Sequence, residues 1–151
     1  MIGWLLDTNV ISELNKRTCA RRVEAWFLAQ SEEFLHLSIL TFGEFDKGID
    51  LLDPADARRA QLIGLRDVLE ASFADRTLPV SRAVVSRWGR ITAQVKRDTG
   101  HPPSVVDTLI AATAIEHDLY LVTRNVRDVR RSGAAIFNPW TDDPIGFPIA
   151  A

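Results

Sequence analysis

Short apolar runs alternate with longer amphipathic stretches along the chain, and this alternation predicts the secondary structure. Five segments have the length and composition of buried or extended strands: residues 2–6, 34–39, 77–80, 119–122 and 134–137. Six stretches carry helical spacing of apolar residues or follow a helix-capping residue: residues 8–14, 22–29, 42–49, 54–73, 82–98 and 104–116. A short helix is also expected at residues 126–132. Strands that alternate with helices predict a parallel or mostly parallel sheet covered by helices.

Three hydroxyl residues are expected to begin helices. Thr41 is expected to cap the helix that carries Glu44, Ser81 the long helix that follows, and Ser104 the helix that carries Asp107. Trp26 and Trp88 lie on apolar stripes of their helices, which favours packing over contact with a ligand.

Composition limits the class of protein. The 151 residues suit one domain, and we expect it to span residues 1–151. The chain is 46% hydrophobic and 25% charged, and it has no apolar run of transmembrane length. A single cysteine, Cys19, agrees with a reducing cytoplasm, so we expect a cytoplasmic protein without membrane contact. A net charge of −2 disfavours binding of nucleic acid through bulk charge, but it permits local contacts to phosphates.

Acidic side chains occur where strands are expected to end. Asp7 follows the first strand, Glu44 follows the second, and Asp107 lies in the helix that leads into the fourth strand. Open α/β sheets form their sites beyond the carboxyl ends of the strands, so these acids can converge there. Neighbouring carboxylates repel one another, and a cation such as Mg²⁺ or Mn²⁺ relieves that repulsion. A cation so held polarises a phosphoryl oxygen, which implies phosphodiester hydrolysis.

The same residues also permit a purely structural interpretation. Asp7 is placed to cap a helix, and Thr41 with Glu44, like Ser104 with Asp107, has the spacing of a capping box. Spacing alone therefore suggests an acidic site without establishing one.

Four segments, in order, resemble the motifs of the PIN-domain family, and in particular the VapC-type, FitB-like toxins of bacterial toxin-antitoxin pairs. They begin at Leu5-Leu6-Asp7-Thr8-Asn9, Ser38-Ile39-Leu40-Thr41, Val106-Asp107-Thr108 and Leu121-Val122-Thr123-Arg124-Asn125. The resemblance covers residues 4–140 and includes the ending Phe137-Asn138-Pro139-Trp140.

The resemblance implies a three-layer α/β/α sandwich and a ribonuclease that cleaves single-stranded RNA with Mg²⁺ or Mn²⁺. It also implies a homodimer and a small antitoxin that blocks the site. Asp7, Glu44 and Asp107 would be catalytic residues and metal ligands, with Asn125 and Asp128 as further candidates for the catalytic site. In this family pattern some relatives carry an acid where this chain has Asn125, which leaves a second metal open.

Four other residues are assigned supporting roles. Thr8 and Thr123 carry hydroxyls that would orient the carboxylates. Arg124 and Arg127 belong to a cluster of arginines near the fourth motif and are candidates for RNA contact, with a solvated surface as the alternative.

Two other functions stay open at this stage. One is a PIN-like nuclease of RNA processing or DNA repair with no toxic role, and the other is a non-catalytic RNA-binding module, which the uncharged Asn125 keeps possible. A phosphate-transfer receiver domain is excluded because it needs a lysine after a late strand, and the last lysine, Lys96, precedes that strand.

Overall fold

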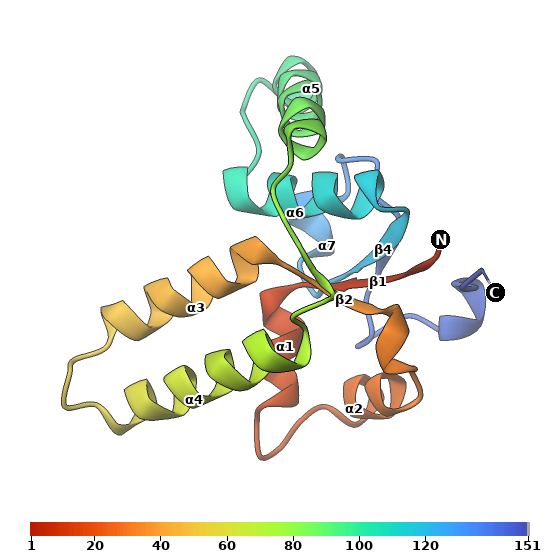
Figure 1. Cartoon of the computed structure of the whole chain (residues 1–151). Helices are drawn as coiled ribbons and strands as arrows, with labels where there is room; N and C mark the ends of the chain where they lie inside the picture. The colour runs from red at the N-terminus through yellow and green to blue at the C-terminus, as the bar shows by residue number, and fades with distance from the viewer. Residues whose placement is uncertain (151) are drawn as a thin grey trace.

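Five parallel strands form the sheet at the centre of the protein (Figure 1). The computed structural model describes residues 1–150. Its strands are β1 (Gly3–Leu6), β2 (Leu35–Ser38), β3 (Thr77–Leu78), β4 (Leu119–Val122) and β5 (Ile136–Phe137). They lie in the order β3-β2-β1-β4-β5, and every neighbouring pair is parallel, as the alternation of strands and helices predicted.

Helices connect the strands. They are α1 (Thr8–Leu14), α2 (Arg21–Leu28), α3 (Ile39–Leu51), α4 (Ala57–Ser72), α5 (Arg82–Thr99), α6 (Val105–Glu116) and α7 (Val126–Val129), with single 3-10 turns at η1 (Glu32–Phe34) and η2 (Pro144–Gly146). In Figure 1, α5 and α6 lie on one side of the sheet and α1 and α2 on the other, while α3 and α4 form a hairpin that projects sideways. No helix within residues 1–150 is long and apolar enough to cross a membrane.

Alternate residues of each central strand are buried on opposite faces of the sheet. In β1, Trp4 and Leu6 join the hydrophobic cluster formed with α1, α2 and α4, whereas Leu5 joins the cluster formed with α6 and α7. Side chains of a strand alternate between the two faces, so a sheet covered on both faces needs apolar residues at every position. This arrangement confirms the three-layer α/β/α sandwich.

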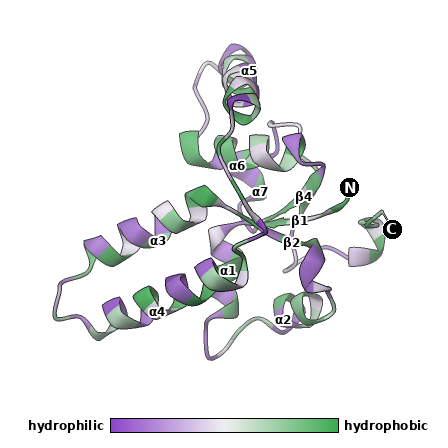
Figure 2. Ribbon diagram, in the orientation of Figure 1, coloured by the Kyte–Doolittle hydropathy of each residue, from purple (hydrophilic) through white to green (hydrophobic). Residues whose placement is uncertain are grey.

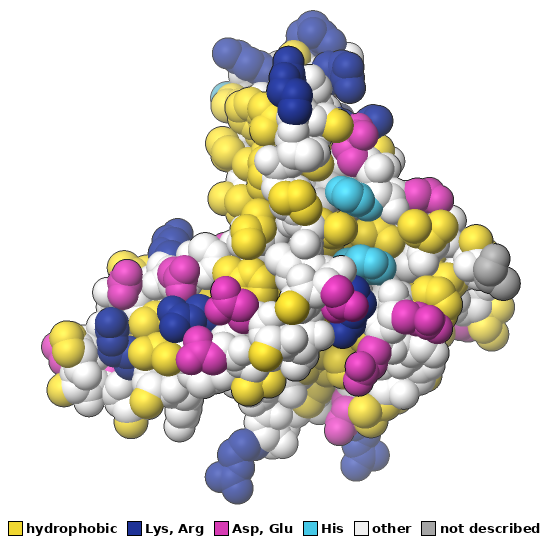
Figure 3. Space-filling view, in the orientation of Figure 1, with side chains coloured by type: hydrophobic (Ala, Val, Ile, Leu, Met, Phe, Trp, Pro, Cys, Tyr) yellow, Lys and Arg dark blue, Asp and Glu magenta, His cyan; other side chains and the backbone are white. Residues whose placement is uncertain are grey.

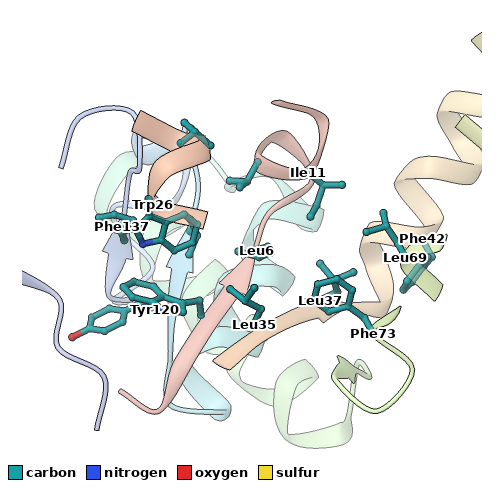
Figure 4. Close-up of a cluster of buried hydrophobic side chains, with 14 of the residues drawn as sticks. Leu6, Ile11, Trp26, Leu35, Leu37, Phe42, Leu69, Phe73, Tyr120 and Phe137 are labelled. Carbon is teal, nitrogen blue, oxygen red and sulfur yellow. The ribbon is translucent and has the colours of Figure 1, made fainter. Parts of the chain in front are cut away.

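The larger cluster is built around aromatic rings that pack against one another at tilted and edge-to-face angles (Figure 4). The ring centroid of Trp4 lies 5.2 Å from Trp26, 5.0 Å from Tyr120 and 5.2 Å from Phe137. Trp26 is only 5% exposed, which confirms that it packs in the core. In Figure 2, α6 is mostly hydrophobic, while α3 and α4 alternate hydrophobic and hydrophilic residues along their length. The sheet is therefore held rigidly in the region from which the predicted site residues project.

The start of α3 differs from the prediction. Ser38, not Thr41, caps this helix, and its hydroxyl accepts a hydrogen bond from the Leu40 N–H at 3.1 Å. Thr41 lies inside the helix and is fully buried, so the predicted Thr41 cap was wrong, and Thr41 and Glu44 do not form a capping box. The apolar run continues through Ile39 and Leu40, so the hydrophobic pattern could not show where the strand ends.

The caps at Ser81 and Ser104 are confirmed. The Ser81 hydroxyl accepts from the Val84 N–H at 3.2 Å, and the Ser104 hydroxyl accepts from the Asp107 N–H at 3.4 Å. Other boundaries differ by a few residues, since helix and strand ends depend on local hydrogen bonds that spacing does not reveal. The helix predicted at residues 54–73, for example, begins only after its cap at Asp56.

Candidate active site

The strand order creates a crevice beside β1. After β1 the chain builds β2 and β3 on one side, and it then returns to place β4 and β5 on the other side. The connections that leave β1 and β4 therefore diverge, and ligands bind at such a switch point in open α/β sheets. Asp7 and Thr123 are the first residues after these two strands, and the Asp7 N–H donates to the Val122 carbonyl at 3.0 Å.

Asp7 is held by hydrogen bonds from three neighbours. Its Oδ1 accepts from the Thr8 N–H at 2.8 Å, which also caps α1. Its Oδ2 accepts from the Thr123 hydroxyl at 2.7 Å and from the Asn9 amide at 3.1 Å. The side chain is buried, and no Lys, Arg or His within residues 1–150 forms an ion pair with it. Asp7 is thus a positioned, buried carboxylate without a cationic partner in the protein.

The surroundings of Asp7 disfavour its ionised form. The pKa of Asp7 is raised to about 6, chiefly because the side chain is buried. Hydrogen bonds from Thr123 and Thr8 lower this pKa, and the nearby charges of Glu44 and Asp107 raise it. The structure therefore brings Glu44 and Asp107 within electrostatic reach of Asp7. These are the three acids that the sequence predicted to converge.

Glu44 is oriented by Thr8. The Thr8 hydroxyl donates to Glu44 Oε2, and it also lies 3.4 Å from the hydroxyl of Thr41. Glu44 projects from α3 and is partly buried. The two predicted supporting threonines thus contact different acids, because Thr123 lies against Asp7 and Thr8 against Glu44.

Asp107 comes from the other side of the sheet. It lies in the first turn of α6, where its backbone N–H is held by the Ser104 hydroxyl and its side chain is partly buried. This turn is fixed by packing of α6 against the sheet through Ile110, Ala111 and Ala114. The three acids therefore come from three different elements: Asp7 from the start of α1, Glu44 from α3 and Asp107 from α6.

The candidates of the fourth motif are placed differently. The Asn125 N–H donates to the Thr123 hydroxyl oxygen at 3.0 Å, so Asn125 supports the Asp7 network through its backbone, and its side chain is exposed. Asp128 and Arg127 line a hollow between α5, α6 and α7. No side-chain hydrogen bond within residues 1–150 joins Asn125 or Asp128 to Asp7. Their predicted catalytic roles stay predictions.

Arg124 is held close to the Asp7 network. Its N–H donates to the Asn9 amide oxygen at 3.2 Å, and its guanidinium lies over the Trp140 ring, 5.2 Å from the ring centroid. The side chain is exposed, so the predicted contact with RNA stays a prediction that this position permits.

Two residues with roles in this region were not identified from the sequence. The Asn9 amide donates to Asp7 and to Thr123, and its carbonyl accepts from Arg124, so it links the connections that follow β1 and β4. Glu13 is buried, pairs with Lys16 at 2.6 Å and accepts from the Ala20 N–H, which fixes the turn after α1. An acid among the apolar positions of a short helix was the available signal for Glu13.

The three acids form an open arrangement. Within residues 1–150, no three Asp, Glu, His or Cys side chains come close enough to enclose a cation by themselves. Mg²⁺ usually retains several waters and takes only one or two carboxylates from the protein. A buried carboxylate with a raised pKa, near two further acids and without a protein cation, fits such a partly hydrated divalent ion.

Comparison with known proteins agrees with this fold. The sequence profile described as "PIN domain" matches residues 4–132, so the chain belongs to the PIN-domain family. Toxin FitB of Neisseria gonorrhoeae is 34% identical over 91% of this chain and 99% of its own length. VapC ribonuclease Y4jK of Sinorhizobium fredii is 39% identical over 90% of this chain and 96% of its own length. These relatives place the chain in the VapC-type, FitB-like branch of the family.

Solved structures show the same relationship. A chain of the FitAB complex bound to an IR36 DNA fragment is 31% identical, with a TM-score of 0.82 over 93% of this chain and 97% of that chain. A chain of the DNA-bound VapBC complex from Salmonella typhimurium is 21% identical, with a TM-score of 0.73 over 93% of this chain and 100% of that chain, and it shares the fold.

Proposed function

We propose that this protein is a metal-dependent endoribonuclease that cleaves single-stranded RNA and acts as the toxin of a toxin-antitoxin pair. The observation that carries the proposal is the buried Asp7 at the switch point of the sheet, with Glu44 and Asp107 acting on its charge. A structural cap would not need two further acids nearby. Membership of the PIN-domain family and a relative named as a ribonuclease support the same conclusion.

Asp7, Glu44 and Asp107 are the residues that would hold Mg²⁺ or Mn²⁺. The bound cation would supply Lewis-acid polarisation of the scissile phosphodiester. The chain's own contribution is to orient the ligands. Thr123 and Asn9 fix Oδ2 of Asp7, while Thr8 fixes Glu44. Hydrogen-bond donors that hold a metal ligand in this way determine which oxygen of its carboxylate faces the metal.

The electrostatics of the site favour cation binding. The raised pKa of Asp7 shows that its ionised form is destabilised in the protein alone, and a divalent charge reverses that effect. Glu44 and Asp107 add negative charge around the same point. Asp7 is already oriented in the metal-free protein, since its donors lie in the first turn of α1 and directly after β4.

The proposed biological role comes from the relatives. One is named a toxin, and the FitAB and VapBC structures are complexes of two different proteins. We infer that this chain also acts with a small antitoxin that covers the site, and that it pairs with a second copy of itself.

Cleavage of a mixed-sequence single-stranded RNA tests the nuclease. The purified protein is assayed with Mg²⁺, with Mn²⁺ and with EDTA, beside Asp7→Asn, Asp107→Asn and the control Asp75→Asn, whose side chain is 84% exposed. We expect metal-dependent cleavage that both site variants abolish and the control retains. Cleavage by either site variant at the normal rate would show that its acid is not needed for catalysis. Cleavage unaffected by EDTA would refute metal dependence.

Induced expression tests the toxic role. Growth should stop with the native chain and continue with Asp107→Asn, and co-expression of a small protein encoded beside the gene should restore growth. A chain that cleaves RNA in vitro but leaves growth unchanged would be a PIN nuclease without a toxic role. A chain that binds RNA but never cleaves it would be the non-catalytic module.

A further inference from the structure

Two adjoining hollows run along one side of α5. The first, of about 410 Å³, lies between the end of α5, the start of α6 and α7. The second, of about 510 Å³, continues along α5. They share Ile91, Arg131 and Ser132 in their linings, so they form one continuous surface, which we term the α5–α7 groove.

The α5–α7 groove is strongly basic. Five arginines and one acid, Asp128, line it; the arginines are Arg87, Arg90, Arg97, Arg127 and Arg131. Arg87 pairs with Glu116, but none of the other four forms an ion pair within residues 1–150. The whole chain has 18 basic and 20 acidic residues, so this concentration of positive charge is local. Figure 3 shows Lys and Arg side chains gathered over α5.

One end of the groove adjoins the helical turn that carries Asp107, although none of the three acids belongs to its lining. Ser104 and Thr108 belong to its lining, and both lie in the first turn of α6 beside Asp107. The Ser104 hydroxyl accepts a hydrogen bond from the Asp107 N–H. Ser104, which lines the groove, and Asp107 therefore belong to the same helical turn. A chain that lay in the groove would therefore pass next to the acidic site.

We propose that the α5–α7 groove binds the sugar-phosphate backbone of single-stranded RNA and leads it to the site at Asp7, Glu44 and Asp107. This inference rests on the proposed nuclease function and adds the path of the substrate. Unpaired guanidinium groups in a row bind successive phosphates, because each offers a planar fork of N–H donors. The carboxylates of the site repel the negative phosphates of RNA. A basic surface nearby is therefore needed to bind a long RNA.

A negatively charged polymer fits the groove better than a small anion does. The free arginines are spread over two hollows rather than converging on one point. The lining contains no Phe, Tyr or Trp side chain on which bases could stack, and His101 is its one imidazole, so contact through the backbone and little dependence on base sequence are expected of this surface.

RNA binding is measured apart from catalysis to test the proposal. Fluorescence anisotropy of a labelled mixed-sequence single-stranded RNA is followed at several salt concentrations with Asp107→Asn, which leaves the RNA uncut. The groove variant adds Arg90→Gln and Arg131→Gln to this chain, and a charge-matched control adds Arg17→Gln and Arg21→Gln, both exposed and outside the groove.

The groove variant should bind RNA on the order of tenfold more weakly near physiological salt, and the slope of log K against log salt should fall by about 1.4, from about 0.7 for each lost phosphate contact. The control should keep the affinity and slope of its parent. Equal binding by the two variants, or no binding of RNA at low salt by their parent, would overturn the proposal. So would a groove variant that binds RNA normally but loses affinity for an acidic protein segment, because the groove would then bind a protein.

The outcomes separate this inference from the proposed function. If the native chain never cleaves RNA but the groove variant loses RNA affinity, the nuclease proposal fails and the groove proposal stands. If the native chain cleaves RNA and the groove variant binds RNA as tightly as the control variant does, only the groove proposal fails.

Discussion

Replacing Asp7 by Asn should make the metal-free protein more stable at neutral pH, even though it removes the central acid of the proposed site. The side chain is 7% exposed, and its pKa is raised to about 6 by burial and by the charges of Glu44 and Asp107. Against about 4 for an unperturbed aspartate, this pKa corresponds to about 3 kcal/mol of lost folding free energy above pH 6. Asparagine carries no charge, so it avoids this cost.

The gain is reduced by hydrogen bonds that an amide cannot reproduce. The amide oxygen can keep the bond from the Thr8 N–H, and the Thr123 hydroxyl can rotate to accept from an NH₂ group at the position of Oδ2, but that group would still face the Asn9 amide donor. Losing such a bond costs about 1 kcal/mol. A net stabilisation of about 2 kcal/mol remains, which is about 4–8 °C in Tm for a chain of this size.

The sign of the pH dependence provides the sharper test. The folded state holds a proton on Asp7 up to about pH 6, whereas the unfolded chain releases it near pH 4. Between these values the folded state binds more protons, so the free energy of unfolding of the native chain falls as pH rises through this window. The variant lacks this contribution, so its advantage should be small at pH 4 and complete at pH 7.5.

Thermal and urea unfolding of both proteins in EDTA at these two pH values measures the effect, with Asp75→Asn as the exposed control. Adding Mn²⁺ at pH 7.5 should stabilise the native chain but not Asp7→Asn. A variant that is less stable than the native chain at pH 7.5, or a difference that does not change with pH, would refute the electrostatic argument.

Four further results are expected. Cation affinity, measured by calorimetry, should fall about tenfold for each pH unit below about 6, because the ion must displace the proton of Asp7. Thr123→Val should lower cation affinity about 10–100-fold, whereas Thr123→Ser, which retains the hydroxyl that donates to Asp7, should stay close to the native value. Gly3→Ala should lower the free energy of unfolding by about 1–3 kcal/mol in urea titrations, because the added Cβ would lie 2.6 Å from the Phe34 carbonyl oxygen. Light scattering after size-exclusion chromatography should give the mass of two chains, and a mass of one chain would refute the proposed homodimer.

Local pattern was sufficient to predict most of the secondary structure. Apolar runs of four residues placed β4 within its observed bounds, and serine at the first position identified the starts of α5 and α6. Where the local signal was ambiguous the prediction failed, as at Thr41, because Ser38 and Thr41 both offered a capping hydroxyl and apolar residues lie on both sides of Ser38. Ser38 is the cap because its hydroxyl accepts a hydrogen bond from a free backbone N–H at the helix start, and residue type alone does not show which hydroxyl does so.

The sequence by itself determined which acids exist, that Asp7 follows the first strand and Glu44 and Asp107 lie near helix starts, and that strands alternate with helices in a parallel sheet. Only the tertiary structure decided that Asp7 and Thr123 share a crevice, because the strand order places β4 beside β1 although more than a hundred residues separate them in sequence. Only the structure showed that Asn9 links Asp7 to Thr123 and that Thr8 serves Glu44. Periodicity reports contacts between residues a few positions apart, whereas burial, charge coupling and the α5–α7 groove arise from segments that meet only after the chain has folded.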